Sequence, residues 1–93
     1  MILYRPHRGS LDEAMAEMKT FDNIDDMKKH IIKELDIFDS DVDCCGPEDI
    51  LFKGLDMDDH RIGWKNVHYV LIRRFYHKKY KYPQVVGQCT FDA

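Results

Sequence analysis

The hydrophobic pattern at the start of the chain predicts a short strand followed by a helix. Residues 2–4 are apolar, and Pro6 ends this segment because proline cannot donate a backbone hydrogen bond to a ladder. Residues 10–13, Ser-Leu-Asp-Glu, match a capping box that starts a helix. Apolar residues then recur at helical spacing, at Leu11, Ala14, Met15 and Met18. This spacing predicts a helix whose apolar stripe packs against a core.

A second helix is predicted after a break at residues 20–22, where we expect Phe21 to plug the core. Asn23 or Asp22 is suited to cap this helix. Aspartates at positions 25 and 26 would lie at its positive N-terminal end. Apolar residues then line one predicted face, at Ile24, Met27, Ile31, Leu35 and Phe38.

The rest of the chain reads as strands. Residues 50–52 are extended in character, residues 67–75 are rich in β-branched and aromatic residues, and residues 84–91 form a last segment. Gly87 in that segment indicates a bulge or a close backbone approach. The order is strand, helix, helix, then three strands with short links. We therefore predict an α+β fold, an antiparallel sheet of three to four strands with two helices packed on one face, in a single domain of residues 1–93.

Composition places the chain among globular proteins of a reducing compartment. Of its 93 residues, 44% are hydrophobic and 33% charged, which argues against disorder. No apolar run approaches the roughly 20 residues that cross a bilayer, and the opening MILYRPHRGS is too polar for a signal peptide. The cysteines, Cys44, Cys45 and Cys89, are odd in number and two are adjacent, which favours free thiols. We expect a cytoplasmic protein with no membrane partner.

Charge is divided unevenly along the chain. Residues 1–60 hold sixteen acidic and seven basic residues, a balance of −9, whereas residues 61–93 balance to +6. The two parts must pack together in so small a domain, so part of this imbalance should cancel internally. The remainder would leave one face acidic and another basic.

Motifs for catalysis or metal binding are incomplete in this sequence. Residues 39–43 space three aspartates like the start of an EF-hand loop, but the later positions hold Cys44 and Ile50 in place of the required Gly and Glu. The adjacent cysteines and scattered histidines lack the paired spacing of a zinc site. No nucleophile stands beside an evident base. We therefore predict no metal, no cofactor and no assembled catalytic residues.

The strongest candidate for binding is a basic, tyrosine-rich tract at residues 73–82. Its cations would contact phosphates or an acidic protein, and its tyrosines would stack on unpaired bases. A solvated surface, or pairing with the acidic loop at residues 36–49, is the structural alternative. The candidate binding residues are Arg73, Arg74, Lys78, Lys79, Tyr80, Lys81 and Tyr82.

Two further polar clusters carry arginines. One contains Arg5, His7 and Arg8, and the other contains Arg61 and Trp64. Trp64 is the sole tryptophan and is expected to anchor a turn onto the core. A scaffold role is favoured for both clusters over a binding site.

Several segments together resemble small uncharacterised proteins of phages and prophages of gram-positive bacteria. They are residues 3–11 (LYRPHRGSL) with Ala14-Met15, residues 59–64 (DHRIGW) and residues 85–87 (VVG). No activity transfers with this resemblance. It implies an accessory protein made in a bacterial cytoplasm, of a kind that more often binds macromolecules than catalyses reactions.

The sequence thus favours a non-enzymatic protein-interaction module, with an unknown protein partner or a second copy as a homodimer. The first alternative is a nucleic-acid-binding protein that uses the tract at residues 73–82. A metal- or thiol-dependent enzyme is a weaker alternative.

Overall fold

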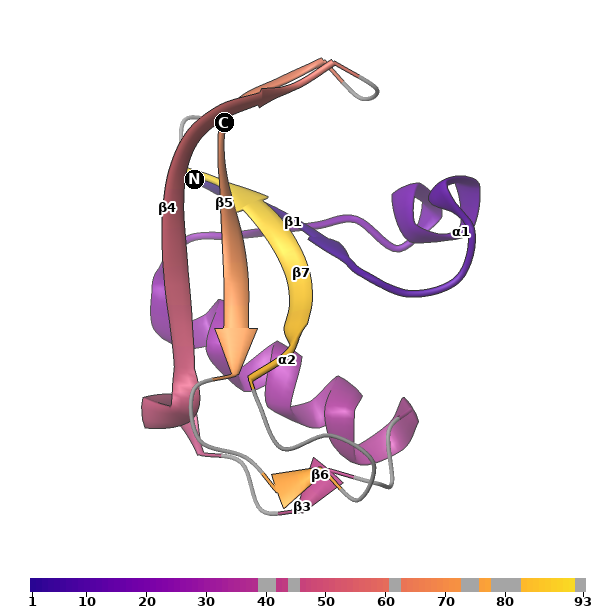
Figure 1. The fold of residues 1–93 in the computed structure, drawn as a ribbon, viewed down its shortest axis with the longest axis vertical. Coiled ribbons are helices and arrows are strands. Elements are labelled where there is room, and N and C mark those ends of the chain that lie inside the picture. The colour runs from indigo at the N-terminus through magenta and orange to yellow at the C-terminus, as the bar shows by residue number, and fades with distance from the viewer. Residues whose placement is uncertain (39–41, 44–45, 61–62, 73–75, 78–82, 92–93) are drawn as a thin grey trace.

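A computed structural model describes residues 1–38, 42–43, 46–60, 63–72, 76–77 and 83–91 (Figure 1). The main sheet contains β1 (Ile2–Pro6), β2 (Lys19–Phe21), β4 (Ile50–Asp59), β5 (Trp64–Ile72) and β7 (Val85–Thr90). The helices are α1 (Leu11–Ala16), α2 (Ile24–Phe38) and a 3-10 turn, η1 (Pro47–Asp49). Two short strands, β3 (Val42–Asp43) and β6 (Tyr76–His77), pair apart from the main sheet.

Five of the described strands form an antiparallel sheet in the order β2-β1-β7-β5-β4. This confirms the predicted α+β class. The prediction missed β2, where Lys19, Thr20 and Phe21 pair with β1. Three residues are too few to show a periodic pattern, so this segment resembled a break in the sequence. The sheet consequently has one strand more than the upper limit predicted.

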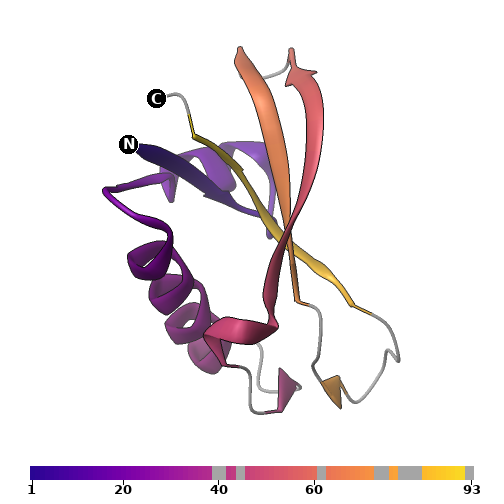
Figure 2. The ribbon, with the colours of Figure 1, turned by 90° about the vertical axis from the view of Figure 1, so that its left-hand side faces the viewer.

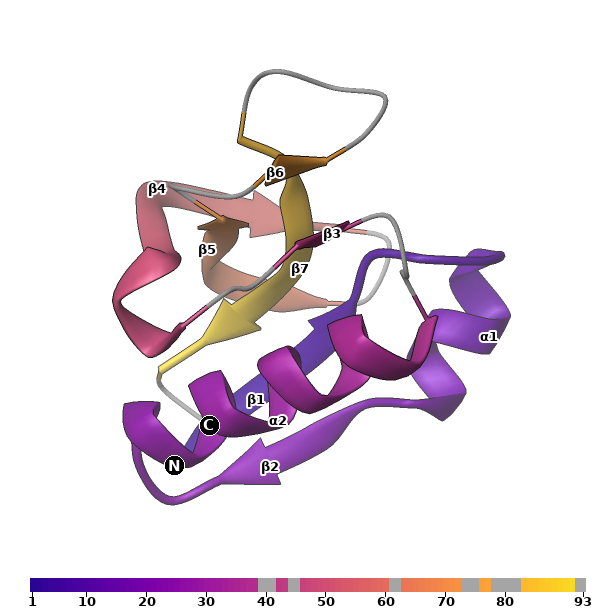
Figure 3. The same ribbon diagram turned by 90° about the horizontal axis from the view of Figure 1, so that it is seen from below.

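Helix α2 covers one face of the sheet (Figures 2 and 3). Asn23 caps it as predicted, because Oδ1 of Asn23 accepts from the Asp26 backbone N–H at 2.8 Å. Met27 and Ile31 are fully buried against the sheet. Ile24, which was assigned to the same face, is instead 40% exposed, because it lies at the first position of the helix.

The core lies between α2 and this face of the sheet. Its buried residues are Ile2, Tyr4, Met27, Ile31, Ile50, Val70 and Cys89, with Phe21, Ile32, Leu35, Phe52, Val86 and Phe91 packed at its margin. Phe21 therefore reaches the core as expected. Because strand side chains alternate between the two faces of a sheet, the core residues of each strand come from the face that lies toward α2.

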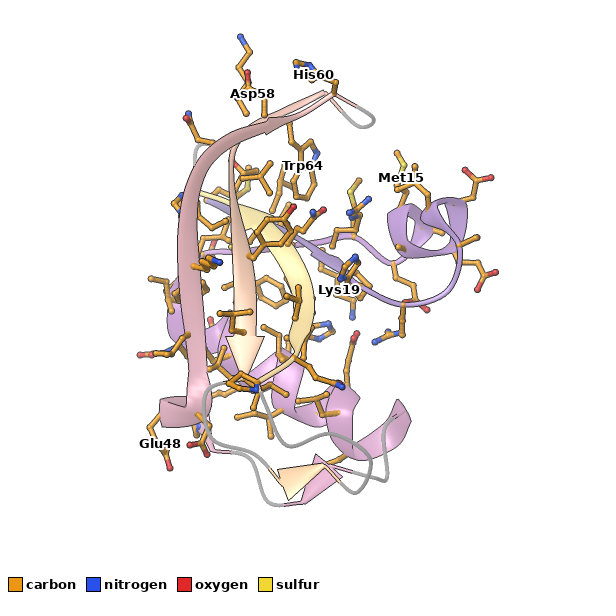
Figure 4. All side chains as sticks on the ribbon, in the orientation of Figure 1. Met15, Lys19, Glu48, Asp58, His60 and Trp64 are labelled. Atoms are coloured by element: carbon orange, nitrogen blue, oxygen red, sulfur yellow. The ribbon has the colours of Figure 1, made fainter. Side chains whose placement is uncertain are left out.

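Helix α1 is peripheral. Its capping box forms, since the Glu13 backbone N–H donates to Oγ of Ser10 at 3.1 Å. The prediction that its apolar stripe packs against the core was wrong. Ala14 is buried, but Leu11 and Met15 are each 37% exposed, and Met15 projects outward (Figure 4). A helix of six residues beside the end of β1 is too short to lay this stripe over the sheet.

Gly87 marks a close approach, as the sequence indicated. A Cβ at this position would lie 2.6 Å from the Tyr4 hydroxyl oxygen and 2.7 Å from the Arg5 carbonyl oxygen. The pairing of β5 with β7 also shifts between Val70 and Leu71. Only glycine leaves the Tyr4 ring room to cross β7 at this point.

No helix in the described ranges is long and apolar enough to cross a membrane.

Candidate functional site

Most of the basic tract predicted to bind a partner lies outside the described residues. This holds for Arg73, Arg74, Lys78, Lys79, Tyr80, Lys81 and Tyr82, and also for Arg61. Within the tract, the backbone of Tyr76–His77 forms β6, which pairs with β3 at Val42–Asp43. A short antiparallel ladder therefore joins the acidic segment of the chain to the basic one.

Arg5, from the first polar cluster, lies in the interior. It stands directly opposite Gln88 where β1 pairs with β7, and the two residues are only 2% and 1% exposed. Nη2 of Arg5 donates a hydrogen bond to Oε1 of Gln88. Buried polar groups are stable when they are hydrogen-bonded. Arg5 thus joins two strands and is not presented to a ligand at the surface.

Arg8 lies at the centre of a charged network that ties the loop after β1 to both helices. Its Nη1 lies 2.6 Å from Oε2 of Glu34 on α2, and its Nη2 lies 2.8 Å from Oε2 of Glu17 at the end of α1. The hydrogen bond to Glu34 is the main factor that raises the pKa of the Arg8 guanidinium above its ordinary value. These contacts fix Arg8 in place between two carboxylates.

His30 extends this network into the core, and sequence reasoning did not identify it. Its Nε2 lies 2.6 Å from Oε1 of Glu34, one helical turn away. Its ring packs on Phe21 and Tyr4, with centroids 5.2 and 6.1 Å apart. Burial lowers the pKa of His30 below its ordinary value, although Glu34 opposes this effect. His30 therefore packs as an aromatic residue beside the Glu34 carboxylate.

A small open pocket of about 170 Å³ lies between the end of β1, α2 and the start of β7. His7 and Arg8 line it together with Glu34. The Tyr4 hydroxyl, also in the lining, donates to the Val86 carbonyl oxygen at 3.1 Å, and burial raises the pKa of Tyr4. Because Arg8 and Glu34 neutralise each other, this pair does not select an ionic ligand.

Cys89 is a core residue in β7. Its side chain is fully buried, and burial raises the pKa of the thiol to about 12. A protonated, enclosed thiol is a poor nucleophile. Cys44 and Cys45 lie outside the described residues, and within those residues no three His, Cys, Asp or Glu side chains are grouped to hold a metal ion.

Trp64 begins β5 next to the tip of the β4–β5 hairpin. It is half-buried and points inward from the hairpin, whereas Asp58 and His60 project outward beyond it (Figure 4). Trp64 pairs with Asp59 in the register of these two strands. The half-buried indole is therefore directed toward the body of the protein.

A row of aliphatic residues crosses three strands of the sheet, and Val85 at one end of it also lines the pocket beside α2. Leu51 pairs with Leu71, and Leu71 pairs with Val85, so the three lie side by side across β4, β5 and β7. Directly paired residues share a face of the sheet. Leu51 and Val85 are each 37% exposed and Leu71 is half-buried. We call these three residues the apolar row.

A second row lies beside the apolar row on the same face. Lys53 pairs with Tyr69, and Tyr69 pairs with Gln88, which binds Arg5. Lys53 is exposed and Tyr69 half-buried, so exposure decreases from β4 toward β1. We call the apolar row together with Lys53 and Tyr69 the open face, because no described helix lies over this side of β4 and the adjoining part of β5 (Figure 2).

The sequence contains a signal for the open face that the prediction did not use. Residues 50–52 and 70–72 are apolar without alternation. A strand that is apolar on both sides indicates that both faces are to be covered. Within one chain α2 covers one side only, and the lateral alignment of Leu51, Leu71 and Val85 depends on strand register, which the sequence does not state.

The chain matches no protein-family model, no curated protein and no solved structure.

Proposed function

We propose that this protein is a non-enzymatic interaction module that binds a protein partner through the open face. One observation carries the proposal: the apolar row places three aliphatic side chains side by side across β4, β5 and β7, with Leu51 and Leu71 on a side of the sheet that lacks a described helix. Scattered surface leucines are ordinary, but a contiguous apolar patch rimmed by polar residues is typical of an interaction site.

The composition of the open face suits a protein interface. Apolar residues at the centre with an aromatic residue and a cation at the rim match the usual anatomy of such surfaces. Burial of apolar surface contributes about 25 cal/mol per Å². Because Leu51, Leu71 and Tyr69 stand on paired strands, little conformational entropy is lost when they bind.

A protein partner is favoured over a nucleic acid. Among the five residues that we call the open face, only Lys53 carries a positive charge. Phosphate binding draws on several cations. The ladder between β3 and β6 also supports the idea that the acidic segment offsets part of the basic tract. The partner is then a protein with a complementary apolar surface.

The cellular setting follows from the resemblance to small phage proteins. We propose an accessory protein that acts in a bacterial cytoplasm. The buried, protonated Cys89 thiol supports a binding role over thiol chemistry at that residue.

A capture experiment with matched variants tests the proposal. The bait is the full chain, compared with Leu71→Ser combined with Val85→Ser, and with the control Ile24→Ser. Ile24 is 40% exposed and lies on α2, away from the open face. We expect wild type and the control to retain the same bacterial protein, and the double variant to lose it.

Circular dichroism and thermal unfolding of each bait must first show that the variants are folded. Equal retention by the double variant would contradict the use of the open face. Retention of nucleic acid that falls steeply with added salt would instead support the alternative function.

A further inference from the structure

The pocket between the end of β1, α2 and the start of β7 is large enough for one ring. Its volume is about 170 Å³. A cavity of about 150 Å³ holds one benzene molecule, whereas the sites of drug-sized ligands begin at about 300 Å³. The ligand of this pocket is therefore limited to a single ring with few substituents, either as a free molecule or as one side chain.

The apolar walls of the pocket come from two elements. Ile31 and Leu35 are four residues apart on α2, so they share one face of that helix. Val85 and Val86 contribute from the start of β7. Ile31 belongs to the buried core cluster, and Leu35 and Val86 pack at its margin. The core therefore holds these walls in place, and they favour an apolar body in the ligand.

The Tyr4 hydroxyl is a buried polar group in the pocket wall. Tyr4 is 1% exposed, and the proton of its hydroxyl is directed to the Val86 carbonyl oxygen, 3.1 Å away. The same carbonyl oxygen accepts from the His7 backbone N–H at 3.0 Å. A hydroxyl oxygen has two lone pairs, and in the described part of the chain no group donates to this one. The wall therefore offers a ligand one hydrogen-bond acceptor.

Gln84 adds a hydrogen-bond donor to the same pocket. It precedes β7, lines the pocket and is half-buried. Its backbone carbonyl oxygen accepts from the Ile72 N–H at 3.1 Å, which ties this residue to the end of β5. A glutamine side chain carries an NH₂ group with two donors. The lining therefore combines an acceptor at Tyr4 with a donor at Gln84, and a ligand hydroxyl satisfies both.

The charged groups beside the pocket already have partners. Oε2 of Glu34 lies 2.6 Å from Nη1 of Arg8, and Oε1 of Glu34 lies 2.6 Å from Nε2 of His30. Nη2 of Arg8 contacts Glu17. A charged ligand would lose its hydration without gaining a counter-ion from these pairs, and an unpaired charge is costly to bury. The pocket therefore favours an uncharged ligand.

We propose that this pocket binds a phenol group, with the ring against α2 and the hydroxyl between Tyr4 and Gln84. The phenol hydroxyl donates to the Tyr4 oxygen and accepts from the Gln84 amide. The bound ring also extends an aromatic cluster, because Tyr4 makes edge contacts with Phe21 and His30 at centroid distances of 6.5 and 6.1 Å.

Two sources supply this chemistry, a free phenol and the tyrosine side chain of a protein. Val85 lines the pocket and also ends the apolar row, so the pocket adjoins the open face. The inference nevertheless goes beyond the proposed function, because a free phenol requires no protein partner.

Titration of the isotope-labelled full chain with phenol, followed by NMR, tests the proposal. We expect saturable shifts of the Ile31, Val85 and Val86 amides with a Kd on the order of 1 mM, because so small a ligand makes limited contact. Benzene lacks the hydroxyl and should bind about tenfold more weakly. Benzoate and benzylammonium carry a charge and should bind at least as weakly as benzene.

The absence of saturable shifts with phenol would overturn the proposal, and so would equal affinity for phenol and benzene or for phenol and benzoate. N-acetyltyrosinamide distinguishes the two sources. Shifts of the same amides would support a tyrosine side chain as the ligand, whereas binding of phenol alone would support a free phenol.

Matched variants locate the bound ligand. Leu35→Trp should abolish phenol binding because the indole fills the pocket, whereas the control Ile24→Trp adds the same ring at a 40% exposed position of α2 and should bind as wild type does. Tyr4→Phe keeps the ring and removes the acceptor, so the preference for phenol over benzene should fall about tenfold. Circular dichroism must show that each variant is folded.

Tyr4→Phe decides the matter if Leu35→Trp does not fold. An unchanged preference for phenol over benzene in Tyr4→Phe, or unchanged phenol binding in a folded Leu35→Trp, would contradict the proposal. None of these variants alters Leu71 or Val85, so this proposal and partner capture by the open face can fail separately.

Discussion

The two faces of the sheet carry similar aliphatic side chains that differ in their exposure to solvent. On the face under α2, Ile50 and Val70 are at most 1% exposed and belong to the same buried cluster as Ile31. In the open face, Leu51 follows Ile50 on β4, and Val85 lies on β7, the strand that pairs with β5. Each of these two residues is 37% exposed. Both sets are aliphatic and both stand on regular strands. The difference is the presence of a helix on one side.

This difference separates stability from function. Residues under α2 supply the burial that a small domain needs in order to fold. Residues of the open face remain partly exposed to solvent, so their substitution should change the affinity for a partner more than the stability of the fold. Each prediction below sets one side of the molecule against the other.

The largest effect is expected in the core. Ile31→Ala should lower the free energy of unfolding by about 2–5 kcal/mol, because it leaves a cavity between α2 and the sheet. Val85→Ala on the open face should change it by less than about 0.5 kcal/mol. Urea unfolding followed by circular dichroism measures both. Similar losses for the two variants would mean that the open face is part of the folding core.

A smaller effect is expected at the crossing of Tyr4 and Gly87. Gly87→Ala should lower the free energy of unfolding by about 1–3 kcal/mol, because the added methyl group overlaps the Tyr4 side chain. The same denaturation assay measures it. Combining Gly87→Ala with Tyr4→Leu should give a loss smaller than the sum of the single losses. Strict additivity would show that the two residues do not compete for this space.

Removing the cap of α2 should cost more global stability than removing the cap of α1, because α2 covers the core and α1 is peripheral. Asn23→Ala removes the acceptor for the Asp26 N–H and should cost about 1 kcal/mol of global stability. Ser10→Ala removes the equivalent bond to Glu13, but α1 is peripheral, so its loss should appear as local fraying. Native-state hydrogen exchange distinguishes these outcomes. Equal global losses would assign α1 to the core.

A dependence on pH should come from the side of α2. Burial holds the pKa of His30 below its ordinary value of about 6.5, so the unfolded chain binds this proton more tightly. Stability should therefore fall as the pH decreases from about 6.5 through the lowered pKa. Glu34 opposes the lowering of the His30 pKa, whereas the positive charges of Lys19 and Arg8 add to it.

Urea midpoints measured across this interval check the effect. His30→Gln should flatten the dependence, whereas the control His60→Gln, at an exposed position on the hairpin, should retain it. A flat profile for wild type would contradict a lowered pKa of His30 in the folded protein.

Much of the fold was predictable because helix caps, apolar spacing and glycine positions are visible in the local sequence. The caps at Ser10 and Asn23, the spacing of Met27 and Ile31, and the glycine at position 87 each indicated a feature that the structure confirms. The errors arose where an element is short. β2 has three residues and α1 has six, so tertiary contacts decide what they cover.

The candidate site was less predictable than the fold. A run of charge such as residues 73–82 is visible in a sequence, whereas the apolar row exists only once Leu51, Leu71 and Val85 are brought together by register. The burial of Arg5 likewise depends on its place opposite Gln88. Exposure on a given face is a property of packing, and local pattern does not encode it.

Photo-crosslinking in bacterial cells tests the central claim most directly. A photoreactive amino acid is placed at Val85 on the open face, or at Ile24 on α2, two positions with exposures of 37% and 40%. We predict that the Val85 protein forms an adduct with a different protein, at a defined mass, and that the Ile24 protein does not form this adduct. Absence of an adduct at Val85, or equal labelling from both positions, would contradict a binding role for the open face.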